Sequence, residues 1–451
     1  MKIAFIPIDN RPVCYNLPKM ISKIDRNIQF FIPERVYLGD LTKYADVEKL
    51  LVWLENIPQV DAIIMSLDTL AYGGLISSRR SPDSFETVAN RVEKLKNILA
   101  KSNAKIYAFS SIMRISNNNI NEEEKEYWAR YGKKIFDYSY QTHKLGCESC
   151  ITNVIPTDIL DDYLATRKRN FDINKIYLEY QKQGLFETLV FSKDDCAEYG
   201  FNVQEAKALE ALGGFVKTGA DEIPLTLLAR AITDFYSKKV KIAPIFLAPE
   251  HKNLISNYED ISIEKSVRGQ LLLVGCDVVE SDMADILLYI NNFENHQGEI
   301  VMKVATKPFC GSWQKPEKPY MIADVRYANG ADNAFVKRIF EAGFDEKFYG
   351  YSAWNTSANS LGSVICTAVV KYFAKSYSEK AFNNLQVVRF LDDWAYQANV
   401  RQQLDITDVK LLAEKMKPFE EEISSRFDLK VDVQYHFPWN RLFEVEIDGL
   451  C

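Results

Sequence analysis

Short apolar runs alternate with amphipathic helical segments along most of this chain, and that alternation sets its fold class. Runs such as AIIMSL and LLLV carry no charged residue, which is typical of parallel strands covered on both faces by helices. Helical periodicity fills the intervals, for example at Phe85, Val88 and Val92. We therefore predict an α/β fold with a mostly parallel sheet, whose first strands are residues 2–8, 29–33, 62–67, 105–110, 188–192, 215–218, 241–247 and 270–274.

The order of predicted strands and helices along the chain indicates two regions. Residues 1–280 are expected to form a (β/α) barrel-like catalytic region, interrupted at about 119–185 by a polar, Tyr-rich helical insertion. Residues 281–451 are expected to form a further α/β region that completes the cleft, with strands at 286–290, 321–325 and 348–352. The alternative is a pair of open, doubly wound sheets. No internal repeat is visible in the sequence.

Charge and hydropathy exclude several functions. The chain has 55 Lys and Arg against 62 Asp and Glu, a net charge of −7, so no overall basic field favours nucleic acid. The longest apolar runs, 284–290 and 364–370, are far shorter than the ~18 residues of a membrane helix. The first residues resemble a buried strand and not a signal peptide. We expect a cytoplasmic protein without a membrane partner; the sequence leaves its oligomeric state open.

The cysteines offer one weak metal motif. The eight cysteines are scattered, and a reducing cytoplasm would keep them as thiols. The only close pair is Cys147 and Cys150, with His143 upstream, a set of ligands suited to zinc. No second pair completes a site, so whether Cys147 and Cys150 bind metal stays open.

Polar residues follow nearly every predicted strand. Because the carboxyl ends of parallel strands form the working face of α/β folds, these residues are expected to converge on one cleft. In the first region they are Asp9, Asn10, Arg11, Asp68, Tyr72, Gly73, Gly74, Arg114, Asp194, Asp195, Asp221 and Glu222.

Each of these residues also has a structural explanation. Asp221 can cap the helix that follows, and Glu222 can then interact with its first turn. Asp9, Asn10 and Arg11 can fix a turn before Pro12. Capping is a weaker explanation for Asp194 and Asp195, because Asn202 is a better cap for the next helix. These two aspartates are therefore favoured as site residues.

Two further segments have the composition of ligand loops. The glycine pair Gly73 and Gly74, followed by hydroxyls and Arg79, can cradle an anion, although it lacks the P-loop ending. The two glycines can equally make room where the backbone nears a substrate. In the second region an amide-rich stretch beside an aromatic ring suits a neutral polar ligand such as a sugar, the residues being Asn329, Asp332, Trp354, Asn355 and Asn359. A hydrogen-bonded turn and helix cap would account for the same residues.

Ordered motifs along the whole chain resemble a known family. They are IDNRP, SLDTLAYGGLISSR, TRKRNFDIN, SKDDCAEYG, TGADE, ADVRYANGAD, YSAWNTSANSLG and DDWAYQANVR. In this order they resemble an uncharacterised bacterial family catalogued as domain of unknown function 4127, over nearly the full length. The resemblance implies an intact family member and supplies no activity.

A second, shorter resemblance concerns chemistry. The pairs Asp194-Asp195 and Asp221-Glu222 resemble the paired acids of retaining N-acetylhexosaminidases, and TGADE is similar to a Gly-Gly-Asp-Glu element of one such family. In those enzymes the first acid orients the acetamido nucleophile and the second protonates the leaving oxygen. This chain departs from the pattern, with Lys217 and Ala220 in place of the usual His and second Gly.

The leading hypothesis is a glycosidase-like hydrolase of a small polar, carbohydrate substrate, with an N-acetylated sugar as one candidate. Asp195 or Glu222 would be the general acid and Asp194 or Asp221 would orient the reacting group, while Arg11 and Arg79 bind polar groups and Trp354 stacks a ring. No cofactor is predicted. One alternative is a hydrolase of phosphorylated or amide substrates in which these carboxylates hold Mg²⁺ or Mn²⁺. The other is a non-catalytic protein that binds a small polar ligand.

Overall fold

The chain divides into two compact units whose segments interleave in sequence. The computed structural model describes residues 1–147, 154–194 and 197–450. The first unit comprises Met1–Asn10, Phe30–Pro224 and Tyr258–Asp260, and the second comprises Arg11–Gln29, Leu225–Asn257 and Ile261–Cys451. The expected division at about residue 280 therefore falls inside the second unit. No described helix has the length and apolar character needed to cross a membrane.

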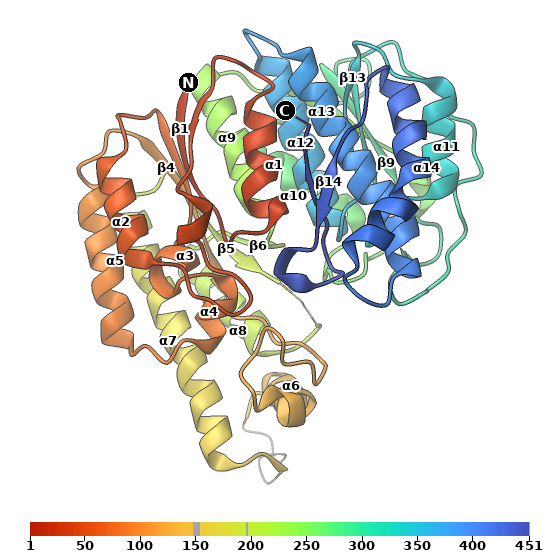
Figure 1. Ribbon diagram of the computed structural model, residues 1–451. Coiled ribbons are helices and arrows are strands. Elements are labelled where there is room, and N and C mark those ends of the chain that lie inside the picture. The colour runs from red at the N-terminus through yellow and green to blue at the C-terminus, as the bar shows by residue number, and fades with distance from the viewer. Residues whose placement is uncertain (148–153, 195–196, 451) are drawn as a thin grey trace. The chain divides into compact units, whose positions relative to one another are not determined.

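A six-stranded sheet forms the centre of the first unit (Figure 1). Its order is β2-β1-β3-β4-β5-β6, and the pairs from β1 to β6 are parallel. The five residues of β3 are all buried, as the continuous apolar run predicts. The strands are β1 (Lys2–Ile6), β2 (Gln29–Phe31), β3 (Ala62–Ser66), β4 (Lys105–Ile112), β5 (Thr188–Lys193) and β6 (Val216–Thr218). The helices beside them are α2 (Val47–Asn56), α3 (Leu67–Tyr72), α4 (Leu75–Arg80), α5 (Phe85–Leu99) and α8 (Phe201–Ala211).

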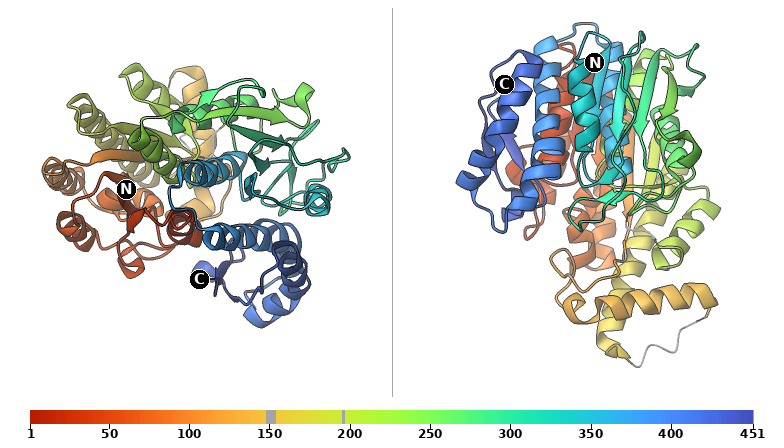
Figure 2. Two further views of the ribbon diagram at one scale, coloured as in Figure 1. Left: turned by 90° about the horizontal axis from the view of Figure 1, so that it is seen from above. Right: turned by 90° about the vertical axis from the view of Figure 1, so that its right-hand side faces the viewer.

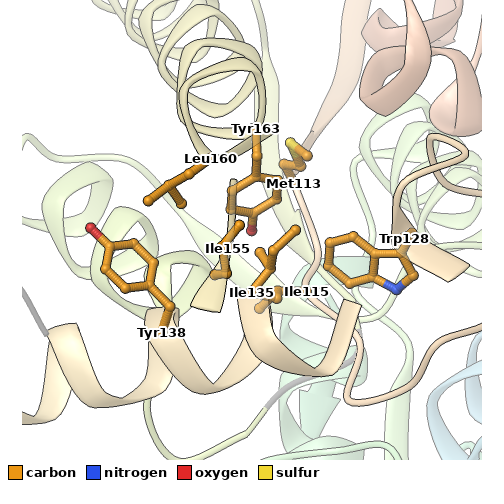
Figure 3. Close-up of a cluster of buried hydrophobic side chains, with 8 residues drawn as sticks. All are labelled: Met113, Ile115, Trp128, Ile135, Tyr138, Ile155, Leu160 and Tyr163. Atoms are coloured by element: carbon orange, nitrogen blue, oxygen red, sulfur yellow. The ribbon is translucent and has the colours of Figure 1, made fainter. Parts of the chain in front are cut away.

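Two long helices of the first unit, α6 (Trp128–Leu145) and α7 (Thr157–Lys182), occupy most of the stretch expected to be a helical insertion. Figures 1 and 2 show α6 and the first half of α7 projecting beyond the sheet. They have their own small core, in which Ile135 of α6 and Tyr163 of α7 meet Met113 and Ile115 from the segment after β4 (Figure 3). This cluster of buried apolar side chains attaches the insertion to the end of β4.

A five-stranded sheet forms the centre of the second unit, in the order β13-β11-β9-β7-β8, with every neighbouring pair parallel. Its strands are β7 (Lys241–Phe246), β8 (Asp277–Val278), β9 (Ile286–Asn291), β11 (Tyr320–Asp324) and β13 (Phe348–Ser352). The main helices are α1 (Pro12–Ser22), α9 (Ile223–Tyr236), α10 (Ile263–Val274), α11 (Asn333–Ala342), α12 (Ser357–Phe373), α13 (Glu379–Arg389) and α14 (Val409–Phe427). Two strand pairs complete the unit, β10 (Gly298–Glu299) with β12 (Tyr327–Ala328), and β14 (Gln434–His436) with β15 (Glu446–Asp448).

The predicted α/β class and mostly parallel sheets are confirmed. Of the two arrangements considered, open sheets fit the strand order, because the described strands leave β2 and β6 as edges of one sheet and β13 and β8 as edges of the other. Both sheets follow the doubly wound order 2-1-3-4-5, with β6 added to the first. The two sheets share only this strand order, and no repeat is visible in the sequence.

One predicted strand is wrong. Residues 270–274 form the last turns of α10, which begins after the cap Ser262 and ends at the left-handed Gly275. The apolar run there is buried because Gln270, Leu271 and Val274 share the inner face of a helix. A short apolar run does not distinguish a buried strand from the buried side of a helix.

Candidate functional site

Polar side chains lie at the carboxyl ends of the first sheet. The sheet has its switch point between β1 and β3, where open α/β folds bind ligands. The Thr69 hydroxyl group fixes the chain there by contacting the carbonyl oxygens of Pro7 and Ile8, both at 2.8 Å. Asp68, directly after β3, lies beside this switch point.

Asp68 is a carboxyl group held inside the protein. Asp68 lies in the first turn of α3, and the residue is only 2% exposed. Oδ2 of Asp68 accepts a hydrogen bond of 2.8 Å from the Ser111 backbone N–H, and the Ser111 hydroxyl group bonds to the same carboxylate. Burial dominates over these contacts and raises the pKa of Asp68 from 3.8 to about 7. At neutral pH this group can therefore both donate and accept a proton.

A line of hydroxyl groups leads from Asp68 across the neighbouring strands. The Ser192 hydroxyl group on β5 donates to the Ser111 hydroxyl group on β4 at 3.1 Å. Asn174 of α7 fixes β4 at this level, accepting from the Ser110 hydroxyl group at 2.7 Å and donating to the Ser111 carbonyl at 3.1 Å. Hydrogen bonds through the Ser111 hydroxyl group thus connect the Asp68 carboxyl group to Ser192 on β5, the strand that precedes Asp194.

Two arginines share two glutamates at the ends of β4 and α4. Arg79 lies within 3.4 Å of Glu123 and within 3.3 Å of Glu124. Arg114 contacts the same two carboxylates at 2.9 and 3.2 Å, and also lies 3.7 Å from the Asp194 carboxylate. Burial, reinforced by the neighbouring charge of Arg114, lowers the pKa of Arg79.

The predicted acid Asp194 lies at the edge of this network, and its side chain is 35% exposed. A carboxylate beside an arginine is favoured in its ionised form. Asp195, the other member of the predicted pair, lies outside the described residues.

The second predicted acid pair follows β6. Glu222 is 1% exposed, lies 3.7 Å from the Lys217 ammonium group and accepts from the Ala220 N–H at 3.1 Å. Burial lowers the pKa of Lys217, and the charge of Glu222 opposes that shift. Asp221 lies half-buried in the turn before α9. Glu222 is thus held in a buried ion pair, whereas Asp194 is partly open to solvent.

Gly219 makes the position of Glu222 possible. Its φ is +124°, a value that side-chain-bearing residues rarely adopt, and a methyl group there would overlap the Glu222 carboxylate. We expect Gly219→Ala to destabilise the protein by about 1–3 kcal/mol, because both the backbone and the ion pair must shift. Urea unfolding measures this loss, with Gly184→Ala as control, since that glycine has φ +81° and open space around it. Equal losses in the two variants would mean that the overlap with Glu222 costs nothing.

A further ion pair lies at the ends of β5 and β6, and no sequence pattern indicates it. Lys193 bonds to the Asp260 carboxylate at 2.6 Å, and the Thr218 hydroxyl group donates to the other oxygen of Asp260 at 2.7 Å. Asp260 comes from the three-residue segment Tyr258–Asp260, which belongs to the first unit although its neighbours in sequence do not. Only the fold brings this carboxylate to the edge of the sheet.

The Tyr72-Gly73-Gly74 segment shapes the chain between α3 and α4. Gly73 adopts a left-handed conformation that ends α3, and a side chain there would press against Tyr44 and Ala45. Tyr72 is buried beneath the Arg169 guanidinium group, 5.1 Å from its ring centre. These contacts favour the explanation that the glycines serve a tight turn; a role in substrate binding stays a prediction.

The Asp9-Asn10-Arg11 motif is divided between the units. Asp9 is buried in the first unit, and the backbone of Asn10 bonds to Gly39 and to the Arg35 side chain. Arg11 belongs to the second unit, where it bonds to Glu444 at 3.1 Å. The predicted site residues thus form two sets, each described within its own unit.

The second unit has a buried acid at the end of β11. Asp324 accepts hydrogen bonds from Asn291 at 2.8 Å, from the Asp332 N–H at 2.8 Å and from the Tyr351 hydroxyl group at 3.1 Å. Burial, followed by the nearby charge of Asp332, raises the pKa of Asp324 to about 7. Asp332 also caps α11 and lies 3.5 Å from Arg326. The observed role of Asp332 is to fix the loop after β11.

The amide-rich loops of the second unit contact each other. The Asn329 N–H donates to the Asn355 carbonyl at 2.8 Å, and both residues have positive φ. Asn329 also donates from its side chain to Glu299 at 2.5 Å. Trp354 is buried, and Asn359 lies in the first turn of α12 after the cap Thr356. The turn-and-cap explanation accounts for much of this stretch, and ligand binding here stays a prediction.

The described residues bring together no group of three or more His, Cys, Asp and Glu side chains that could hold a metal ion. Cys147 is exposed, and Nδ1 of His143 accepts from the Gly200 N–H at 3.0 Å. Cys150 lies outside the described residues, so the proposed zinc motif stays untested.

These features define an α/β protein with two parallel sheets of the same strand order and a charged carboxyl edge on the first. A family model described as a protein of unknown function (DUF4127) matches residues 3–448. The chain belongs to this family, as its ordered motifs predict. A search of curated proteins finds no match.

Proposed function

We propose that the protein is a hydrolase of a small polar substrate, a glycoside being the leading candidate, which acts at the carboxyl edge of the first sheet. The observation that carries this proposal is Asp68, whose pKa of about 7 suits proton transfer at neutral pH. Its place beside the switch point is where ligands bind in folds of this kind.

Two carboxyl groups with different environments can take the two roles that hydrolysis of a glycoside needs. Asp68, buried, would be the general acid that protonates the leaving oxygen, directly or through the Ser111 hydroxyl group. Asp194, whose carboxylate lies 3.7 Å from Arg114, would stabilise positive charge on the reacting carbon or orient the nucleophile. Environments that push two pKa values apart are the usual basis of acid and base roles in one site.

This assignment changes the roles proposed for two residues. Glu222 is already engaged in the structure by the Lys217 ammonium group at 3.7 Å and by the Ala220 N–H. Asp68, expected only to contact substrate, takes over that role. Arg79 and Arg114 would bind polar or anionic groups of the substrate through their guanidinium N–H groups.

Turnover of a panel of aryl glycosides, including N-acetylhexosaminides, tests the proposal. Wild type should release the aglycone, and Asp68→Asn and Asp194→Asn should each lower kcat/KM at least about 100-fold, the usual scale of acid or base catalysis. Glu210→Gln removes a carboxylate from the exposed face of α8 and should leave turnover unchanged. Turnover that survives Asp68→Asn would refute the role of this residue. No turnover of any glycoside would refute the substrate class.

A further inference from the structure

The motif TRKRNFDIN lies on α7, and its last residue, Asn174, contacts the end of β4 beside the candidate site. Asn174 is only 3% exposed. A buried amide side chain is stable where its carbonyl oxygen accepts a hydrogen bond and its NH₂ group donates one. Asn174 makes both kinds of bond, and both partners belong to β4.

β4 extends beyond its neighbour β3. The register pairs Ser66, the last residue of β3, with Phe109. Two residues further along, the same register would pair Asp68 with Ser111. The chain has already turned into α3 there, so the Ser111 backbone N–H and carbonyl need other partners. The Asp68 carboxylate accepts from this N–H at 2.8 Å, and the Asn174 NH₂ group donates to the carbonyl at 3.1 Å.

The same amide also holds the preceding residue of β4. The Ser110 hydroxyl group, which is buried, donates to the Asn174 carbonyl oxygen at 2.7 Å. On its other edge, β4 pairs with β5 as far as Ile112. The end of β4 is therefore fixed by β5 along one edge and by the side chains of Asn174 and Asp68 where β3 has ended.

Ser111 acts on Asp68 with two donors, its backbone N–H and its hydroxyl group. Burial raises the pKa of Asp68, and both of these hydrogen bonds oppose that rise, because they favour the ionised carboxylate. The other charged or titratable groups that interact electrostatically with Asp68 are Arg79 of α4, Tyr72 of α3 and Tyr177 of α7. The position of Ser111 thus influences how readily Asp68 releases its proton.

We infer that Asn174 is a positioning residue for Asp68: by holding Ser110 and Ser111 at the end of β4, it keeps both Ser111 donors on the Asp68 carboxyl group. This inference rests on the proposed role of Asp68 as proton donor. Without the amide of Asn174 the end of β4 can shift, both hydrogen bonds weaken, and Asp68 keeps its proton to higher pH.

Carbon NMR of the aspartate side-chain carboxyl groups in the full-length protein measures the protonation of Asp68 without any substrate, and Asp68→Asn identifies its signal. Asn174→Leu keeps most of the side-chain volume and removes both hydrogen bonds. The titration midpoint of Asp68 should then rise by about one pH unit, the equivalent of one net hydrogen bond. Ser110→Ala removes a single hydroxyl group and should move the midpoint in the same direction by less.

Asn170→Leu is the matched control. Asn170 lies one turn earlier on α7 and is similarly buried, but its NH₂ group donates to the Ser78 carbonyl at 2.9 Å and not to β4. This variant should leave the midpoint of Asp68 unchanged.

Turnover gives a second readout. With an aryl glycoside that wild type cleaves, the fall of kcat/KM at high pH should move upward in Asn174→Leu together with the midpoint, a change that loss of stability alone does not produce. A midpoint that stays at the wild-type value in both Asn174→Leu and Ser110→Ala would overturn the inference, and so would an equal movement in Asn170→Leu. A moved midpoint without turnover of any glycoside would count against the proposed substrate class and leave the inference standing.

Discussion

Asp68→Asn should flatten the pH dependence of the free energy of unfolding between about pH 4 and pH 7. The pKa of Asp68 is about 7 in the folded protein against 3.8 for an ordinary aspartate. The folded state therefore binds more protons than the unfolded state in this range, and stability falls as pH rises. The contribution is fully present below pH 3.8 and is lost as pH passes 7; its full size is about 4 kcal/mol. Asparagine stays uncharged, so this loss should disappear.

Urea unfolding of wild type and Asp68→Asn at pH 4.5, 6 and 8 measures the effect. The variant should gain stability relative to wild type as pH rises. Part of the wild-type slope should remain, because the pKa values of Asp324 and Asp393 in the second unit are also raised to about 7. Glu210→Gln, the exposed control, should keep the full slope. An unchanged slope in Asp68→Asn would mean that Asp68 is ionised at low pH despite its burial.

Arg167→Met should lower the free energy of unfolding by about 3–5 kcal/mol. Arg167 joins α7 to α8 through two hydrogen bonds to Glu205, from Nε at 2.9 Å and from Nη2 at 2.7 Å. It also donates to the Tyr163 hydroxyl group at 3.1 Å, within the core of the insertion. Methionine keeps much of the volume but leaves the largely buried Glu205 carboxylate without its partner.

The neighbouring Lys168 offers a matched control. Its ammonium group is mostly exposed and pairs with Asp172 one turn away, so Lys168→Met should cost less than about 1 kcal/mol. The double variant Arg167→Met/Glu205→Gln should recover part of the loss, since it removes the buried charge. If Arg167→Met costs no more than Lys168→Met, the Arg167–Glu205 pair does not hold α7 against α8.

Most strands of both sheets were predictable from sequence because apolar runs are a local signal, whereas the two-residue strand β8 was not predicted. Runs such as 62–67 carry no charged residue, which favours a strand buried on both faces. The error at 270–274 has the same source, because a buried helical face also produces such a run. The division into units was not predictable: the chain passes between them after residues 10, 29, 224, 257 and 260, where neither composition nor a linker marks a boundary.

The candidate site was predictable in position and not in chemistry. Asp68 was expected at the ligand face because it follows a strand, but its raised pKa depends on burial by residues distant in sequence. Asp260 reaches Lys193 only through the fold. Arg389 and Asp392 are buried within the helical stretch 379–400, although charged residues of a helix usually face solvent, and no sequence pattern marks them as buried.

The pH dependence of glycoside hydrolysis tests the central claim most directly, namely that Asp68 supplies the proton at the edge of the first sheet. With any aryl glycoside that wild type cleaves, kcat/KM should fall as pH rises past about 7, because Asp68 loses its proton there. Asp68→Asn should lose this limb together with the activity, and substrates with a more acidic leaving group should be the least affected. A wild-type profile that stays flat from pH 5 to 9 would contradict the claim.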